Sequence, residues 1–262
     1  MKLYRTQWIG LSILTILLAF VLIEKLWFKG DIARQQLELT FAEPNWHDIL
    51  GTDHYGRSNA ARLADAIMNS LLMAGLCVTT ASLLGTISGV WAGWQKGWVD
   101  RIFSLLVNIV MALPGLVLVL LFGAIFPGSF FLLFIAISIT MWADYFRVIR
   151  SETQAAVLSD AFESSRLFGF SRWYLFRRHI WPEIRNDVYT LSCFGAGHAI
   201  LSLAALGFLY VGLRPPHAEL GMMMVELFRY YDQGFWVLLQ PIVVVSLLIF
   251  SFHLLAQRGS RT

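Results

Sequence analysis

Residues 102–143 read I-F-S-L-L-V-N-I-V-M-A-L-P-G-L-V-L-V-L-L-F-G-A-I-F-P-G-S-F-F-L-L-F-I-A-I-S-I-T-M-W-A, without one Asp, Glu, Lys or Arg. A helix needs roughly 20 apolar residues to cross the hydrocarbon core of a bilayer. The stretch is long enough for two such helices, and residues 126–129, F-P-G-S, supply a turn between them because Pro and Gly interrupt helices. Pro114-Gly115 predicts a kink within the first of the two helices.

Four further blocks lack charged residues in the same way and hold one helix each: 6–23, 66–95, 188–213 and 233–257. The chain is 57% hydrophobic and only 14% charged, which excludes an ordinary soluble domain. We predict an all-α, polytopic membrane protein in which residues 1–262 form a single domain. Its six spans are expected at about 8–28, 66–93, 102–125, 129–147, 187–212 and 235–256.

Lys and Arg residues are distributed unevenly over the predicted loops. Most of the 20 lie in four segments: 1–7, 94–101, 144–187 and 257–262. Because basic residues mark the cytoplasmic side, both termini are expected inside, with an external segment at 29–65 and a cytoplasmic loop at 148–186. This bias explains the basic balance without a nucleic-acid partner, since the chain has no basic stripe. The two cysteines, Cys77 and Cys193, fall inside predicted spans and are expected to be packing residues.

The predicted cytoplasmic loop contains a polar, arginine-rich stretch at 163–182, E-S-S-R-L-F-G-F-S-R-W-Y-L-F-R-R-H-I-W-P. Three- and four-residue spacing predicts a helix with one apolar stripe, formed by Val157, Leu158, Ala161, Phe162, Ser165 and Phe168. Gly169 can end this helix in a left-handed conformation, and Ser171 can cap the next one. The second helix offers aromatic and arginine side chains, a composition typical of protein interfaces. The alternative is a helix lying at the lipid headgroups.

This stretch resembles the cytoplasmic coupling loop of bacterial ABC importer permeases, whose pattern is E-A-A-x-x-x-G, nine further residues, and I-x-L-P. Glu163, Gly169 and Pro182 match the pattern, and the R-H-I-W-P ending is similar to the peptide/nickel class. Four positions depart from it: Ser164, Ser165, His179 and Trp181. The resemblance implies that an ATPase subunit contacts Glu163, Ser164, Gly169, Ser171, Arg172, Trp173, Arg177, His179 and Pro182.

The resemblance also implies an assembly in the bacterial inner (plasma) membrane, surrounded by lipid. A second, homologous permease would complete the translocation path, ABC ATPase subunits would hold ATP and Mg, and an external solute-binding protein would deliver the cargo. Closure of the ATPases would move a docking helix at about 170–178, aimed by the turn at Gly169. This chain has no G-x-x-x-x-G-K-[ST] phosphate-binding loop, so we expect no bound cofactor and no catalytic residue in it.

Residues 50–57, L-G-T-D-H-Y-G-R, resemble the L-G-T-D-x-x-G-R motif of dipeptide, oligopeptide and nickel permeases. The two glycines bracket a tight polar turn in which the Asp can accept hydrogen bonds from backbone amides. The alternative is a metal site formed by His47, Asp48, Asp53 and His54, but this spacing matches no dedicated site, and we expect none. Contact with the external binding protein is expected through Gly51, Thr52, Asp53, Gly56 and Arg57.

Two further segments resemble the same class. Residues 142–150, W-A-D-Y-F-R-V-I-R, match W-x-x-Y-x-R-x-x-R, and Asp144 and Arg147 are expected to pair because they are three residues apart on one helix. Residues 207–222 contain G-F-L-Y-V-G, P-P and E-L-G-M, similar to F-L-G-L-G, P-P and W-G-x-M. The family signatures therefore extend over most of the chain.

His198 is the ionisable side chain deepest in a predicted span, so it is either a pathway residue or a hydrogen-bonded packing residue. Asp144 is expected at a different depth, and the chain has no H-E-x-x-H or G-x-S-x-G motif, which disfavours an intramembrane enzyme. A di- or oligopeptide is the favoured cargo, and nickel or a metallophore-chelated metal is the alternative. A membrane scaffold that recruits a soluble partner is the alternative from another class.

Overall fold

The computed structural model describes residues 4–28, 30–46, 48–125, 128–213 and 217–257. The helices are α1 (Arg5–Ile23), the π-helix η1 (Glu24–Phe28), the 3-10 helix η2 (Leu37–Leu39), α2 (Asn59–Gln95), α3 (Gly97–Met111), α4 (Gly115–Ile125), α5 (Phe130–Val157), α6 (Asp160–Leu167), α7 (Arg172–Leu175), the π-helix η3 (Phe176–Ile180), α8 (Trp181–Phe208), α9 (Leu220–Phe228) and α10 (Phe235–Ala256). Within these residues there is no β-strand, so the predicted all-α class is confirmed.

Five helical stretches are long and apolar enough to cross a membrane: Arg5–Phe28, Asn59–Gln95, Phe130–Val157, Arg172–Phe208 and Phe235–Ala256. Helices α3 and α4 pass the same test only as a pair, which is bent by 78°, so the described residues hold five candidate spans, or six if this pair counts as one. The break includes Pro114, which has no N–H to donate and clashes with the preceding turn of a helix. The predicted kink is thus a sharp break between two helices.

The turn predicted at 126–129 lies only partly within the described residues. Phe126 and Pro127 lie outside them, whereas Gly128 has a positive φ of 85°. Ser129 is the N-cap of α5, and its side chain accepts a hydrogen bond from the Leu132 amide at 3.5 Å. The capping hydroxyl therefore marks the start of the fourth span.

Helix α2 packs closely against α5 through small residues. A Cβ atom on Gly85 would collide with Tyr145, and one on Gly93 would lie 2.8 Å from a backbone carbonyl oxygen of α5. Together with Gly89, these glycines let the two backbones approach, as small residues do between helices inside a membrane bundle. A Cβ atom on Gly75 would have no neighbour within 4 Å, so this glycine lies on the face of α2 that points away from the core, whereas its neighbours Ala74 and Cys77 are buried.

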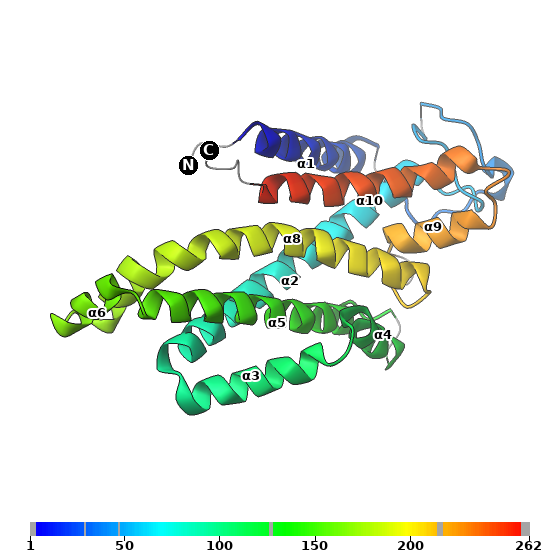
Figure 1. The fold of residues 1–262 in the computed structure, drawn as a ribbon. Coiled ribbons are helices and arrows are strands. Elements are labelled where there is room, and N and C mark those ends of the chain that lie inside the picture. Colours follow the sequence, from blue (N-terminus) through cyan, green and yellow to red (C-terminus); the bar gives the residue numbers. More distant parts are fainter. Residues whose placement is uncertain (1–3, 29, 47, 126–127, 214–216, 258–262) are drawn as a thin grey trace.

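The long helices form a layered bundle (Figure 1). Helix α8 lies between α10 on one side and α2 with α5 on the other, and α1 covers α10. The Tyr145 hydroxyl lies 2.9 Å from Ser192 Oγ and joins α5 to α8. The side chain of Gln7 donates to the Leu255 carbonyl at 3.1 Å, so the start of α1 lies beside the end of α10. Both helix ends point toward the end of the bundle that carries α6.

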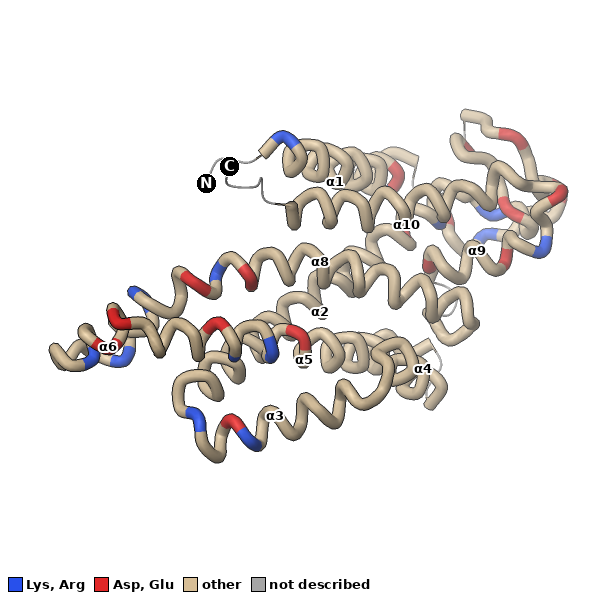
Figure 2. Tube along the Cα trace, in the orientation of Figure 1, with Lys and Arg blue, Asp and Glu red and all other residues tan. Residues whose placement is uncertain are grey.

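Charged residues gather at the two ends of this bundle (Figure 2). One end carries α6 and the neighbouring turns of α5 and α8, and the other carries α9 and the irregular segment that precedes α2. The predicted external segment is shorter than expected, since its last residues, 59–65, already belong to α2. The long uncharged stretches between the two ends have the length of a membrane core.

The docking helix predicted at about 170–178 is not separate from the span predicted from about 187, which is a correction to the sequence prediction. Helices α7, η3 and α8 are continuous, and residues 172–208 form one helical rod. Pro182 stands in the first turn of α8, and the Trp181 amide donates to the Phe176 carbonyl five residues back. This π-turn accommodates a residue that cannot donate its own helical hydrogen bond. The rod ends at Phe208, before the predicted residue 212.

Candidate functional site

The loop between α5 and α8 forms a tip, residues 158–181, at one end of the molecule. Ser159 caps α6, because its hydroxyl accepts a hydrogen bond from the Phe162 amide at 3.3 Å. The Phe162 ring is buried in an apolar cluster with Leu175 and Ile180. This cluster fixes α6 against the first turns of the long rod.

The turn between α6 and α7 has the geometry that the sequence predicts. Gly169 has a φ of 79°, a left-handed conformation that glycine adopts without steric cost. Ser171 then caps α7 and accepts a hydrogen bond from the Tyr174 amide at 3.3 Å. The ring of Phe170 stacks on that of Tyr174, with 4.4 Å between their centroids. The direction in which α7 leaves α6 is therefore defined by backbone and ring contacts.

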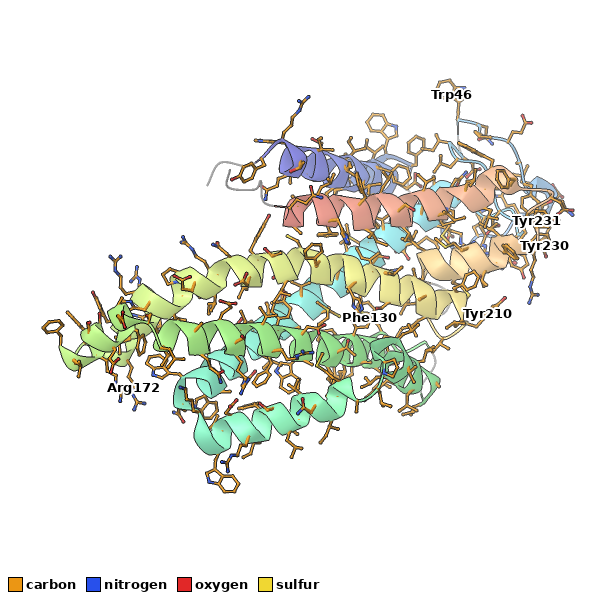
Figure 3. All side chains as sticks on the ribbon, viewed as in Figure 1. Trp46, Phe130, Arg172, Tyr210, Tyr230 and Tyr231 are labelled. Carbon is orange, nitrogen blue, oxygen red and sulfur yellow. The ribbon has the colours of Figure 1, made fainter. Side chains whose placement is uncertain are left out.

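The tip presents an apolar and arginine-rich surface. The stripe predicted for its first helix is wrong in part, because Phe162 is buried but Leu158 and Phe168 are 71% and 83% exposed. Trp173 on α7 is 67% exposed as well. His179 and Pro182 are half-buried, and Figure 3 shows Arg172 at the outer end of the molecule. The other predicted ATPase contacts on the exposed surface are Glu163, Ser164, Gly169, Ser171, Arg172 and Arg177.

At the opposite end, residues 50–57 form the predicted tight turn. Gly51 and Gly56 both have positive φ angles, 73° and 69°. The Asp53 carboxylate accepts hydrogen bonds from the Tyr55 amide at 2.8 Å and from the Arg57 amide at 2.9 Å. The turn is therefore held by the hydrogen bonds between Asp53 and the backbone that its sequence indicates.

Asp53 also organises an ion-pair cluster that the sequence did not reveal. Its Oδ2 accepts from Arg57 Nε at 2.7 Å and from Arg62 Nη1 at 2.6 Å. Glu226 of α9 accepts from the same two guanidinium groups, at 3.1 and 2.7 Å. Burial would raise the pKa of Asp53, but Arg62, the backbone amides and Arg57 together hold that pKa below its usual value. Asp53 and Arg57 belong to the motif at 50–57, but nothing in the sequence indicated that Arg62 and Glu226 would join them.

The predicted contact with a binding protein needs a correction. All five of its residues are buried in this chain: Gly51, Thr52, Asp53, Gly56 and Arg57. They hold the turn in place, whereas the intervening Tyr55 is 41% exposed. Figure 3 shows Trp46, Tyr230 and Tyr231 at this same end of the molecule. The accessible surface of this end therefore includes the exposed side chains of Trp46, Tyr55 and Tyr231, and the motif's charged residues are not part of it.

Asp53, His54 and Glu226 bring three potential metal-ligand atoms within 4.8 Å of one another. These residues do not fit a metal ion, because a cation would meet the two guanidinium groups that already occupy the carboxylates. His54 instead stacks on Tyr230, with 5.0 Å between centroids, and burial lowers its pKa. The cluster supports the predicted structured turn over a metal site. His47 lies outside the described residues.

Glu219 explains the glycines of the segment that follows α8. Its carboxylate is buried and caps α9, accepting from the Gly221 amide at 2.9 Å and the Met222 amide at 3.1 Å. Any Cβ atom on Gly207 would collide with this carboxylate, and one on Gly212 would lie 2.7 Å from it. Burial raises the pKa of Glu219 to about 8. The two glycines thus make room for a carboxyl group that joins α8 to α9.

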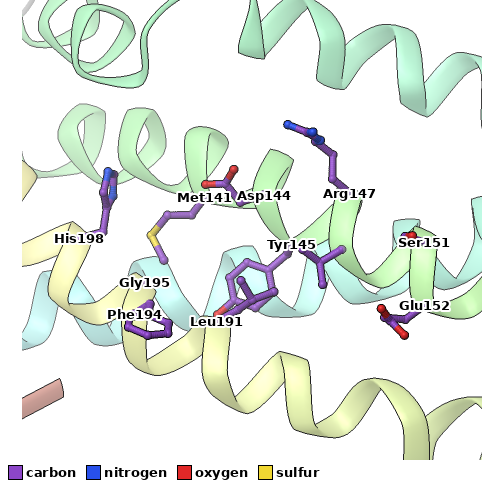
Figure 4. A pocket seen from close by; sticks show the side chains of 11 residues that line it. Met141, Asp144, Tyr145, Arg147, Ser151, Glu152, Leu191, Phe194, Gly195 and His198 are labelled. Carbon is purple, nitrogen blue, oxygen red and sulfur yellow. The ribbon is translucent and has the colours of Figure 1, made fainter. Parts of the chain in front are cut away.

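A cavity of about 580 Å³ lies between α5 and α8 (Figure 4). Asp144 and Glu152 line it from α5, and His198 lines it from α8. Asp144 and His198, which we expected at different depths, thus line the same cavity. The predicted pair of Asp144 with Arg147 is wrong, since no N–O distance of 4 Å or less joins these described side chains. In Figure 4 Arg147 extends away from the side of the cavity formed by α8.

The family described as "Binding-protein-dependent transport system inner membrane component" matches residues 85–261, which include α5, the tip, α8 and α10. This chain belongs to that family. The permease is therefore a multi-pass membrane component of a transport system, in which a binding protein and an ATPase are its partners. Membership assigns it to transport subunits and not to the enzymes.

Three relatives and one solved structure resemble the permease over most of its length. It is 26% identical to the dipeptide transport system permease protein DppC of Alkalihalophilus pseudofirmus, covering 94% of this chain and 81% of the relative. Identity is 28% to DppC of Haemophilus influenzae, covering 86% and 78%, and 28% to the glutathione transport system permease protein GsiD of Pectobacterium atrosepticum, covering 79% and 68%. A chain of the inward-facing MetNI methionine ABC transporter superposes with a TM-score of 0.54 at 16% identity, covering 71% of the permease and 89% of that chain. This last likeness shows a shared fold.

Proposed function

We propose that this permease is one of two related permease subunits in an ATP-driven importer that carries di- or oligopeptides into the cytoplasm. Its tip docks a separate ATPase subunit, and the chain hydrolyses no ATP itself. The start of α1 and the end of α10 lie toward the same end as the tip. The Lys and Arg bias supports a cytoplasmic position for that end. The opposite end, with Trp46 and Tyr231 exposed, then receives the solute-binding protein.

The exposed tip is the observation that carries this proposal. Leu158, Phe168 and Trp173 expose large apolar side chains outside the membrane-spanning length, beside exposed arginines. Exposure of large apolar side chains to water is energetically unfavourable unless a partner protein covers them. Arg and Trp are also frequent in interface hot spots. The tip is small and convex, which suits insertion into a cleft of the partner.

The continuous rod connects the tip directly to the membrane-spanning part of the chain, so that a movement of the tip can be transmitted. Residues 172–208 run without a break from Trp173 in the tip to His198 beside the α5–α8 cavity. Because packed helices move as rigid bodies, displacement of the tip is passed along this rod to the cavity. A scaffold that only recruits a soluble partner has no need for such a connection, so the rod favours transport coupling.

The cavity favours a peptide as the cargo. Asp144 and Glu152 offer carboxylates for a peptide amino terminus, and the same cavity has apolar surface from Leu191 and Phe194 for side chains. Relatives of this permease are named for dipeptide and glutathione transport. In the described residues, three potential metal ligands converge only at the Asp53 turn, where arginines occupy the carboxylates. Nickel or a metal chelate is therefore the second candidate.

The test is to co-purify the chain with the products of adjacent genes and to measure ATP hydrolysis in membranes of defined lipid. The binding protein would be added alone, with a mixture of di- and oligopeptides, or with Ni²⁺ and histidine. We expect stimulation by the peptide mixture beyond that of the binding protein alone. Stimulation only by chelated Ni²⁺ would replace the peptide by a metal chelate. Failure of any ATPase to co-purify would contradict the docking role of the tip.

A further inference from the structure

A second cavity, of about 320 Å³, lies between α3 and α5 near the end of the bundle that carries the tip. Its polar lining consists of Ser104 and Asn108 from α3 and of Arg147 and Arg150 from α5. Val107 and Phe146 form its apolar floor, where the two helices pack together. Arg147 lies between the two cavities and lines the α5–α8 cavity too, whereas Ser104, Asn108 and Arg150 line only the α3–α5 cavity.

The cavity carries one guanidinium group that has no close ion pair within the described residues, although Asp144 interacts with it at longer range. Arg150 is paired, because both its Nε and its Nη2 donate to the Asp100 carboxylate, the latter at 2.6 Å. Arg147 has no carboxylate oxygen within 4 Å in the part of the chain that the structure describes. Its contact is with the sulfur of Met111, 3.4 Å from Nη1, at the last residue of α3. A guanidinium group without an acceptor beside a polar cavity is suited to an anion.

The surroundings of the cavity place it at the surface of a membrane. Trp98 in the first turn of α3 is 76% exposed, and Arg101 lies over its ring at 5.7 Å. Tryptophan and arginine side chains are typical of the level of the lipid headgroups. Leu105 and Ile109 on the same helix are exposed and apolar, as expected for contact with acyl chains. A polar cavity thus lies beside an apolar flank, which matches the two parts of a phospholipid.

We infer that this cavity binds the phosphate of an anionic phospholipid headgroup, with Arg147 as its main ligand. The planar guanidinium can donate two hydrogen bonds to phosphate oxygens, and the Asn108 amide can donate to the same group. The Ser104 hydroxyl donates to the Asp100 carboxylate at 3.3 Å and lines the cavity without a free proton. The acyl chains would lie along Leu105 and Ile109. Basic cavities between spanning helices on the cytoplasmic side are suited to anionic headgroups, because the cytoplasmic leaflet is rich in them. The lipid would hold α3 against α5, next to the rod that moves with the tip.

Lipid binding can be measured on the full chain, with any subunits that co-purify, independently of transport. We would titrate the protein with phosphatidylglycerol or with zwitterionic phosphatidylcholine and count bound lipids by native mass spectrometry. Arg147→Gln should weaken phosphatidylglycerol binding by about tenfold, the loss expected for a charge-assisted bidentate contact. Arg147→Lys should give an intermediate affinity. Arg229→Gln, an exposed arginine beside α9 at the opposite end, is the matched control and should bind as the wild type does.

A phosphatidylglycerol affinity in Arg147→Gln equal to that in Arg229→Gln would overturn the site. Displacement of the lipid by an equal concentration of inorganic phosphate would show that a free anion occupies it, which would overturn the lipid as the ligand. Should Arg147→Gln fail to fold, Asn108→Leu provides a second variant, since Asn108 is exposed on α3 and the larger apolar group removes a donor. The same loss of phosphatidylglycerol is expected there, and an unchanged affinity would equally overturn the proposal.

Discussion

Ser165 Oγ lies 2.9 Å from His179 Nε2, and this hydrogen bond joins α6 to η3 within the tip. Both residues depart from the coupling-loop pattern, in which an alanine and an isoleucine stand at these positions. The two departures therefore compensate each other, because a polar contact replaces an apolar one. The His179 ring also meets Phe162 edge-on, with 5.9 Å between centroids, so the polar pair is part of the packing of the tip.

The pairing predicts non-additive mutations. Ser165→Ala and His179→Ile should each destabilise the tip by about 1 kcal/mol, because each leaves one half-buried partner without its hydrogen bond. The double variant restores the pattern of the family and should be more stable than the sum of the two single effects. A double-mutant cycle on thermal unfolding in detergent measures this coupling. Additive losses would contradict the compensation.

Reversing the charge of Glu163 or adding a large side chain at Gly169 should abolish uptake without removing the protein from the membrane. Glu163 and Gly169 are both exposed, so Glu163→Lys and Gly169→Arg leave the core of the bundle intact. At Gly169 a Cβ atom would meet no neighbour within 4 Å, so a substitution strains only the backbone at φ 79°. Gly169→Asn is the control, because asparagine tolerates this conformation, and it should retain more uptake than Gly169→Ala. Normal uptake in both Glu163→Lys and Gly169→Arg would contradict coupling through the tip.

Two glycines of one helix should respond oppositely to the same change. Gly85→Ala should lower the free energy of unfolding by about 1–3 kcal/mol, because the added Cβ collides with Tyr145 in a closely packed contact. Gly75→Ala places its Cβ in open space and should be neutral or slightly stabilising, since alanine favours helix. Unfolding of the two purified variants in detergent compares them directly. Equal stability of the variants would show that α2 and α5 are not in close contact at Gly85.

Removal of the Asp53 carboxylate should be strongly destabilising. Asp53→Asn leaves Arg57 and Arg62 buried with one acidic partner, and breaking a buried pair costs about 3–5 kcal/mol. Because the pKa of Asp53 is lowered on folding, its contribution is present above its ordinary pKa and is lost as pH falls through the lower folded value. Melting temperatures measured over a range of pH should show this loss of stability at acid pH in the wild type but not in Asp53→Asn. The exposed Asp232→Asn is the control, and an equally mild effect of both variants would contradict the cluster's role.

Glu219 should produce the opposite dependence on pH. Its folded pKa is raised to about 8 from an ordinary 4.5, so the folded state holds the proton more tightly than the unfolded state. The free energy of unfolding should therefore fall as pH rises from about 4.5 to about 8. The side chain of Glu219→Gln cannot titrate. As pH rises through this range, the melting temperature of the wild type should therefore fall relative to that of the variant. Parallel pH profiles for the two proteins would show that the carboxyl group is not buried.

Features that depend only on neighbouring residues, such as spans, turns and helix caps, could be predicted from the sequence. Charge-free blocks predicted the spans, since only a helix satisfies its own backbone hydrogen bonds in lipid. Gly169 and Ser171 predicted the turn and cap of the tip, because φ preference and hydroxyl capping depend on near neighbours. Periodicity failed at Phe168, which lies on the apolar stripe but is exposed. A stripe predicts burial only if a surface is there to cover it, and in this chain alone none is.

The sequence by itself determined that the chain spans a membrane, where its helices lie and which segment forms the tip, because hydropathy and turn chemistry act over a few residues. Only the tertiary structure decided which charges meet. Arg57 pairs with Glu226, 169 positions away, and Asp144 faces the same cavity as His198. Such contacts arise from helix packing, in which a partial rotation of one helix or the loss of a single close-packed glycine changes which side chains meet. The long-range electrostatics of this permease are therefore properties of the packed bundle and cannot be assigned from residue order.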